Sequence, residues 1–84
     1  MDLILFTRKG CQLCERIEDF LACYCPEALV IDVDSHREHQ KQYGQRVPVL
    51  HLNGVDILEG NFSERALLSA LQGKVRSLRE GSNG

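Results

Sequence analysis

The chain has 84 residues, four cysteines and a formal net charge of −2 at pH 7. This length allows a single domain with one small core. The hydrophobic fraction of 43% and the charged fraction of 26% are typical of a globular protein rather than a disordered one. The near-neutral charge argues against a nucleic-acid partner, and no apolar run is long enough to span a membrane. No secretory signal is visible, so we expect a cytoplasmic protein.

A strand, a loop and a helix are predicted at the start of the chain. Leu3–Phe6 is a short apolar run typical of a strand buried on both faces, and the polar residues 7–10 predict a loop. Apolar residues then recur at helical spacing from Gln12, and Pro26 stops this helix because it lacks a backbone donor. The side chains expected on the apolar face of the helix are Leu13, Ile17, Phe20, Leu21 and Tyr24.

A second strand and a short helix follow. Ala28–Val33 is apolar and β-branched before it acquires acidic residues, and it predicts the strand. Ser35 is a good N-cap for a short helix over His36–Tyr43, and Gly44 ends that helix. The pattern of this helix is nearly all polar.

A hairpin is predicted next. Val47–Leu52 and Val55–Leu58 indicate two further strands. The intervening pair, Asn53 and Gly54, favours a type I′ turn, which requires a left-handed backbone at both positions. We therefore expect these two strands to be antiparallel neighbours.

The last helix is marked at both ends. Ser63 is placed to cap it, and Phe62 and Leu67 are spaced as a hydrophobic staple around that cap. Gly73 is the expected end, so residues 1–73 form one domain and residues 74–84 a flexible tail. The element order is β-α-β-α-β-β-α, in which the first βαβ unit should be parallel and right-handed. The predicted fold class is therefore α/β, with a four-stranded mixed sheet and helices on both faces.

The chemistry is concentrated in Cys11-Gln12-Leu13-Cys14, which opens the first helix directly after the first strand. A Cys-x-x-Cys in this setting is typical of a thioredoxin-like redox motif. Cys11 lies at the helix N-terminus, where unpaired N–H groups and the helix dipole favour negative charge. Such surroundings lower thiol pKa values to roughly 3.5–7.5. With Arg8 and Lys9 adding positive charge, Cys11 is the predicted nucleophile, and Cys14, one turn inside, the resolving thiol.

Other cysteines and histidines are weaker candidates. Cys23 and Cys25 end the first helix at a spacing that does not favour a mutual disulfide, and we interpret both as incidental thiols. His36 and His39 could join the Cys-x-x-Cys pair in a zinc site, but the spacing between the pairs is longer than in typical zinc motifs. We therefore predict no metal ligands in this chain.

Several segments together resemble one known family. Residues 6–14 combine an aromatic, a polar and a basic residue with Cys-x-x-Cys, and Val47-Pro48, Asn53-Gly54 and Gly60 follow in order. This set resembles the glutaredoxin branch of the thioredoxin fold over residues 3–72. Small bacterial-type glutaredoxin-like proteins share two further stretches with this chain, Ile31–Asp34 and Tyr43–Leu50.

The resemblance implies that Pro48 is cis and lies beside the Cys11 thiol. It also implies that the backbone of Val47 is unpaired and binds the thiol substrate like an added strand. These implications place Val47 and Pro48 in the substrate site.

Two departures from the glutaredoxin pattern affect glutathione binding. Gln12 and Leu13 stand where glutaredoxins usually have Pro-Tyr. The last turn carries Glu59 before Gly60 and Asn61, and a glutamate there would repel a glutathione carboxylate. Arg8 and Arg46 could still pair with a carboxylate. The other residues assigned to the substrate site are Lys9, Gln12, Leu13, Gly60 and Asn61.

The predicted function is a thiol–disulfide oxidoreductase acting on protein disulfides or glutathione mixed disulfides. No bound cofactor is expected, and glutathione is a possible co-substrate. The electron donor is glutathione or a thioredoxin-reductase-type protein, and the chain is expected to be a monomer. Two alternatives remain: a metal or iron–sulfur cluster carrier that uses the same thiols, and an interaction module of the thioredoxin fold without redox activity.

Overall fold

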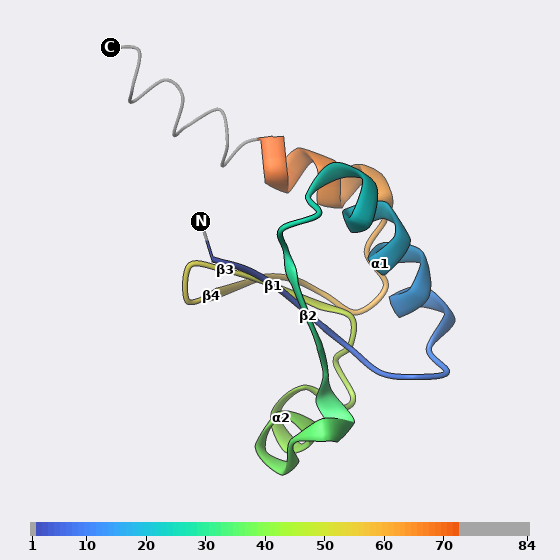
Figure 1. The fold of residues 1–84 in the computed structure, drawn as a ribbon, viewed down its shortest axis with the longest axis vertical. Helices are drawn as coiled ribbons and strands as arrows, with labels where there is room; N and C mark the ends of the chain where they lie inside the picture. The colour runs from blue at the N-terminus through green and yellow to red at the C-terminus, as the bar shows by residue number, and fades with distance from the viewer. Residues whose placement is uncertain (1, 73–84) are drawn as a thin grey trace.

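Four strands form one mixed sheet in the order β2-β1-β3-β4 (Figure 1). The computed structural model describes residues 2–72. The central strand β1 (Leu3–Thr7) pairs in parallel with β2 (Leu29–Asp32) and antiparallel with β3 (Val49–Leu52). β4 (Val55–Glu59) pairs antiparallel with β3 at the other edge. The mixed sheet predicted from the sequence is confirmed.

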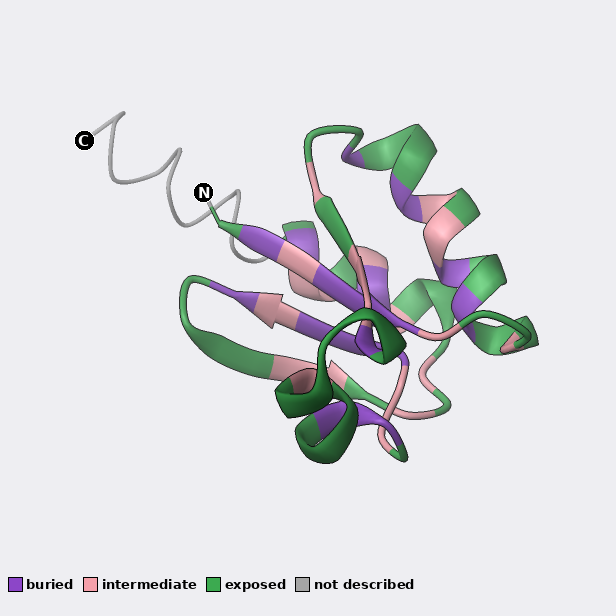
Figure 2. Ribbon diagram, turned by 60° about the horizontal axis from the view of Figure 1, so that its bottom comes forward, coloured by how far each residue is buried: buried purple, intermediate pink, exposed green. Residues whose placement is uncertain are grey.

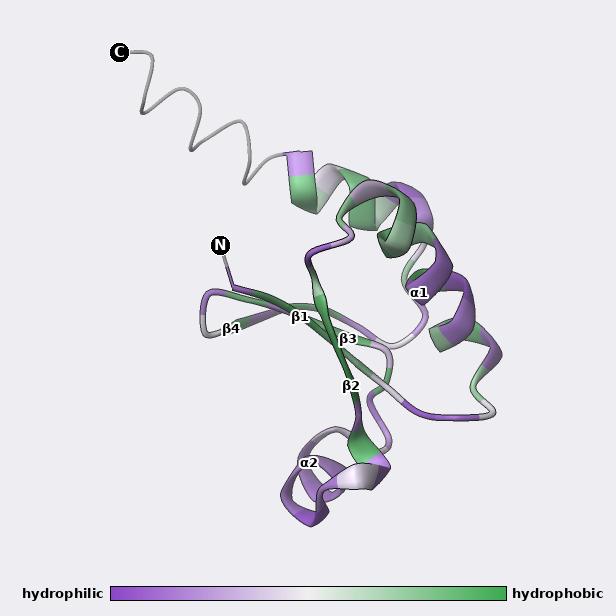
Figure 3. Ribbon diagram, viewed as in Figure 1, coloured by the Kyte–Doolittle hydropathy of each residue, from purple (hydrophilic) through white to green (hydrophobic). Residues whose placement is uncertain are grey.

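Helices cover both faces of this sheet, also as predicted. α1 (Gln12–Tyr24) and the last helix, described over residues 64–72, pack on one face. A short 3₁₀ turn η1 (Val33–Ser35) and α2 (Arg37–Tyr43) lie on the other (Figure 1). α2 is hydrophilic over most of its length (Figure 3).

The period-2 alternation of the strands divides the core into two clusters. Leu5 and Leu50 face α1 and the last helix, whereas Phe6 and Val49 face α2. Figure 2 shows the buried positions concentrated on the central strands and on the inner sides of the helices. The larger cluster contains Leu3, Leu5, Ile17, Leu21, Cys25, Leu50, Leu52, Leu67 and Leu71. β1 is therefore covered on both faces, as its apolar run predicted.

The turn and cap signals are confirmed. Asn53 has φ 49° and Gly54 has φ 87°, as a type I′ turn requires. The Ser63 hydroxyl accepts a hydrogen bond from the backbone N–H of Ala66 at 3.0 Å, which caps the last helix. Phe62 packs against the core cluster that contains Leu67, as the predicted staple requires.

The predicted N-cap of α2 is wrong. Ser35 ends the 3₁₀ turn η1, and its hydroxyl donates to the carbonyl of Asp32 at 2.6 Å. His36 is the N-cap residue instead and makes no side-chain cap bond. The chain already turns at Asp32, whose side chain accepts the N–H of Asp34 at 2.9 Å, and α2 is capped one residue later than predicted.

Some strand boundaries, and the exposure of two side chains of α1, also differ from the predictions. β3 begins at Val49 rather than two residues earlier, and β2 is shorter than predicted at both ends. Leu13 and Tyr24 lie at the borders of the apolar face of α1 and are 37% and 60% exposed. The predicted end of the last helix at Gly73 and the predicted tail lie outside the described residues. Over residues 2–72, no helix is long and apolar enough to cross a membrane.

Candidate active site

One end of the sheet gathers the residues that the sequence analysis assigned to the site. β1 runs into the loop before Cys11, and its residue Phe6 pairs with Val49, the first residue of β3. Glu59, at the end of β4, also pairs with Val49. The cysteine loop, the segment 46–48 and the segment 60–61 therefore leave or enter the sheet at the same end.

Cys11 and Cys14 form a close pair at the start of α1. Cys11 is the N-cap residue, with an extended backbone, and its sulfur accepts a hydrogen bond from the backbone N–H of Cys14 at 3.2 Å. The first helical turn closes when the N–H of Glu15 donates to the Cys11 carbonyl at 3.0 Å. Gly10, at φ 81°, supplies the left-handed turn that leads into the helix. A thiol takes the place that a serine or aspartate usually holds in a helix cap.

The two thiols differ sharply in accessibility. Cys11 is partly exposed, whereas Cys14 is fully buried at 0% exposure. Burial, together with the hydrogen bond to Cys11, raises the pKa of Cys14 to about 12. Cys14 therefore stays protonated at neutral pH, and Cys11 is the thiol that an incoming disulfide can reach.

Pro48 follows a cis peptide bond and is fully buried at the start of β3. This confirms the cis bond that the resemblance implied. The expectation of an unpaired Val47 backbone is wrong for its N–H, which donates to the carbonyl of Tyr43 at 3.1 Å. The end of α2 reaches this segment and supplies the acceptor. Gly60 is tied to the same segment, because its N–H donates to the carbonyls of Arg46 (3.0 Å) and Pro48 (2.9 Å).

The Arg8 side chain is engaged with the α2 side of the molecule. Its Nε and Nη2 atoms donate to the two carboxylate oxygens of Asp34, each at 3.0 Å. Its Nη1 atom donates to the carbonyl of Gly44 at 2.9 Å. Gln40 also donates to Asp34, at 3.0 Å. The hydrogen bond from Arg8 holds the pKa of Asp34 below its ordinary value.

Arg46 is engaged in the same way with β4. Its Nε and Nη2 atoms donate to the two carboxylate oxygens of Glu59, at 3.0 and 2.9 Å. Nη2 also donates to Asp56 at 3.1 Å, and the guanidinium lies 5.2 Å from the ring centre of Tyr43. The expectation that Arg8 and Arg46 are available for a substrate carboxylate is therefore not met, because both bind carboxylates of this chain.

Comparison with known proteins identifies the family. The model of the glutaredoxin-like domain (DUF836) matches residues 2–72. The chain belongs to this glutaredoxin-like family. No curated protein matches the chain by sequence. The X-ray structure of a Northeast Structural Genomics target protein from X. campestris is similar, with a TM-score of 0.72 and 29% identity over 84% of this chain and 96% of that one.

The remaining predicted site residues of the glutaredoxin-like chain lie on the surface around this end. Lys9 and Gln12 are exposed in the loop and the first helical turn, and Leu13 beside them is partly exposed. Asn61 is exposed and Gly60 is half-buried beyond β4. Lys9, Gln12 and Leu13 adjoin Cys11 along the chain, whereas Gly60 and Asn61 reach the same end of the sheet from β4.

Sequence reasoning missed the carboxylates that occupy the arginines. Asp34 lies two residues after β2, the parallel neighbour of β1, so the carboxyl ends of the two strands bring it toward Arg8. The predicted parallel pairing of these two strands was therefore a signal that could have placed Asp34 near Arg8. Asp56 also accepts from the ring Nδ1 of His51 at 2.7 Å, a pair that the hairpin register places together. Glu59 was expected to repel anions rather than to bind Arg46.

The other cysteines and histidines of the glutaredoxin-like chain lie apart from this pair. Cys23 is exposed, whereas Cys25 is buried at the end of α1 and its thiol donates to Glu27 at 3.4 Å. His39 packs edge-on against Phe6 with ring centres 5.2 Å apart. Among residues 2–72, no three potential metal ligands gather into one group.

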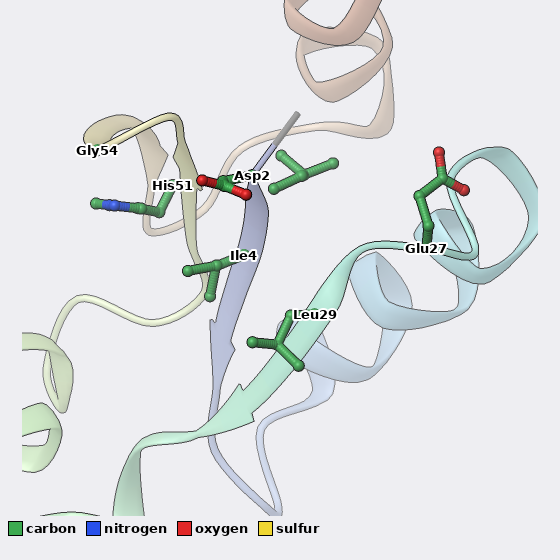
Figure 4. Close-up of a pocket in the computed structure, with 7 residues that line it drawn as sticks. Asp2, Ile4, Glu27, Leu29, His51 and Gly54 are labelled. Carbon is green, nitrogen blue, oxygen red and sulfur yellow. The ribbon is translucent and has the colours of Figure 1, made fainter.

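Among the cavities lined by residues 2–72, two flank the sheet. One of about 330 Å³ lies beside the cysteine loop and is lined by Thr7, Arg8, Lys9, Gly10, Glu15, Glu18, Val30 and Asp32. The other, of about 390 Å³, lies near the turn between β3 and β4 and the start of β1 (Figure 4). Its lining is formed by Asp2, Leu3, Ile4, Glu27, Leu29, His51 and Gly54. Only the first cavity shares residues with the candidate active site.

Proposed function

We propose that this glutaredoxin-like protein is a thiol–disulfide oxidoreductase, with Cys11 as the nucleophile and Cys14 as the resolving thiol. One observation carries the proposal: the sulfur of Cys11 is partly exposed at the start of α1 and accepts the N–H of Cys14 at 3.2 Å, while Cys14 is fully buried. The accessible thiol lies at the positive end of a helix, and its partner lies one turn inside.

The exchange proceeds in two balanced steps. The Cys11 thiolate attacks one sulfur of a substrate disulfide, so that a mixed disulfide forms and the first substrate thiolate leaves. Cys14 then loses its proton and attacks the Cys11 sulfur, which releases the second substrate thiolate. The protein gains a Cys11–Cys14 disulfide and gives up two electrons, and the substrate receives them. A dithiol donor reverses the sequence.

The high pKa of Cys14 suits this order of events. A protonated Cys14 does not compete with Cys11 for the substrate, so Cys11 is the thiol that makes the first attack. We also propose a cytoplasmic location, because disulfides of cytosolic proteins are typically transient and catalytic, as this pair is proposed to be. The proposed electron donor is glutathione or a thioredoxin-reductase-type protein.

A trapping experiment tests the proposal. In a Cys14→Ser variant the mixed disulfide at Cys11 has no resolving thiol, so adducts with disulfide substrates should accumulate. A Cys23→Ser variant is the matched control, because it removes an exposed thiol outside the pair. An absence of Cys11 adducts in the Cys14→Ser protein, with either glutathione disulfide or lysate proteins, would rule out the proposed reaction.

A further inference from the structure

Both arginines at the candidate active site are neutralised within the chain. Arg8 presents its fork of N–H donors to Asp34, and Arg46 presents its fork to Glu59. A guanidinium bound in this two-point manner to one carboxylate has few donors left for a second. Further donors are used by the carbonyl of Gly44 for Arg8, and by Asp56 and the carbonyl of Gln42 for Arg46.

The other charges at this end of the sheet are mainly negative. The cavity of about 330 Å³ beside the cysteine loop is lined by the carboxylates of Glu15, Glu18 and Asp32. Burial, and then the charges of neighbouring carboxylates, raise the pKa of Glu18. Lys9 lines the same cavity and makes no ion pair with another residue of the described part of the chain. An anionic substrate would therefore meet one unpaired lysine and several carboxylates.

We propose that the substrate of Cys11 is a disulfide within a polypeptide, flanked by uncharged or basic residues, rather than a glutathione disulfide. This inference rests on the proposed function. Each glutathione tripeptide carries two carboxylates, and the arginines that would hold them are occupied. A polypeptide offers apolar side chains instead, and the proposed contacts for them are the partly exposed Leu13, two residues after Cys11, and the half-buried Val47, before the cis proline.

The experiment compares disulfides that differ only in charge. Three disulfide-linked dimers of one blocked tripeptide carry Cys between two Lys, two Gln or two Glu residues, and glutathione disulfide is the fourth substrate. Each reaction oxidises the reduced protein to the Cys11–Cys14 disulfide and releases two tripeptide thiols. The rate with each substrate is divided by its rate with dithiothreitol, which removes differences in intrinsic reactivity. Mass spectrometry of the alkylated protein measures the fraction in which Cys11 and Cys14 have formed a disulfide.

We expect the normalised rates with the Lys and Gln dimers to exceed those with the Glu dimer and with glutathione disulfide by about threefold or more. Added salt should narrow the difference, because it screens charges at the surface. In a Glu59→Gln variant, Arg46 loses its main partner, and the rates with the two anionic substrates should rise about two- to fivefold, the range expected of an exposed ion pair. A Glu27→Gln control makes the same change of charge away from the site and should leave the ratios unchanged.

The experiment distinguishes a wrong substrate inference from a wrong proposed function. If the Glu dimer or glutathione disulfide reacts as fast as the Lys dimer, the substrate inference is wrong while the proposed function stands. Ratios that stay unchanged in the Glu59→Gln variant would also contradict the inference. If no dimer oxidises the Cys11–Cys14 pair, the proposed function itself is wrong, and the inference falls with it.

Discussion

Arg8 and Asp34 are joined by two hydrogen bonds of 3.0 Å, which tie the loop before Cys11 to the turn η1 on the opposite face of the sheet. The hydrogen bond to Asp34 is the largest cause that raises the pKa of Arg8, and the charges of Asp34, Asp32 and, last, Cys11 add to it. Asp34 therefore fixes where the Arg8 guanidinium lies, three residues before Cys11.

Replacement of Asp34 by Asn should make Cys11 more reactive. The variant removes a negative charge and leaves that of Arg8 unneutralised, which favours the thiolate. We expect the rate of Cys11 alkylation at neutral pH to rise about two- to fivefold, the scale of an exposed ion pair. An Asp2→Asn control at the other end of β1 should not change the rate. A slower reaction in Asp34→Asn would show that Asp34 acts on Cys11 in another way.

Gly44 should not tolerate a larger residue. A Cβ atom at this position would lie 2.4 Å from the Gln40 carbonyl oxygen and 3.0 Å from Nη2 of Arg8. We expect Gly44→Ala to reduce the free energy of unfolding by about 1–3 kcal/mol through overpacking. Urea denaturation measures the change, and Gln45→Ala, at the exposed neighbouring position, is the control. Equal stabilities of the two variants would contradict the close approach of Arg8 and Gly44.

The stability of the fold should fall in acid partly through Asp56. The hydrogen bonds from His51 and Arg46 hold the pKa of Asp56 below its ordinary value of 3.8. A carboxyl group with a lowered folded-state pKa stabilises the fold above its ordinary value, and the contribution is lost as the pH falls through the folded-state pKa. Asp56→Asn should therefore be less stable than the wild type by about 1 kcal/mol at neutral pH. The difference should shrink as the pH falls from the ordinary value through the folded-state pKa, and a difference independent of pH would contradict this assignment.

Alkylation should separate the four thiols. Cys11 and Cys23 are accessible, whereas Cys14 and Cys25 are buried and burial raises the pKa of both. We expect iodoacetamide at neutral pH to modify the first two and to leave the other two largely unmodified until the protein unfolds. Peptide mapping after timed quenching gives the order in which the four thiols are alkylated. Rapid modification of Cys14 in the folded protein would contradict the assigned roles.

Most of the fold could be predicted from the sequence because its signals are local. The Asn53-Gly54 turn, the Ser63 cap and the apolar run of β1 each depend on a few neighbouring residues, and each is confirmed. The misplaced cap at Ser35 has the opposite cause. The Asp32 side chain competes for the backbone N–H of Asp34, and residue preferences alone do not show which local bond is stronger.

The candidate site was only partly predictable, for a related reason. The spacing of Cys11 and Cys14 and their place before a helix are visible in the sequence. The pairing of Arg46 with Glu59 depends on the β3–β4 hairpin, which brings the segment before β3 next to the end of β4. The occupied N–H of Val47 depends on where α2 ends. Tertiary contacts of this kind decide which charges and backbone groups remain available to a substrate.

The central claim is that Cys11 and Cys14 form a reversible redox pair, and a redox titration tests it most directly. The protein is equilibrated in glutathione buffers of graded potential, alkylated, and its disulfides are mapped by mass spectrometry. Equilibrium does not depend on how fast glutathione reacts, so the result is independent of substrate preference. We predict one two-electron transition that joins Cys11 to Cys14, at about −200 to −270 mV, the range of glutaredoxins and thioredoxins. If the two cysteines never form a mutual disulfide across the range, the account is wrong.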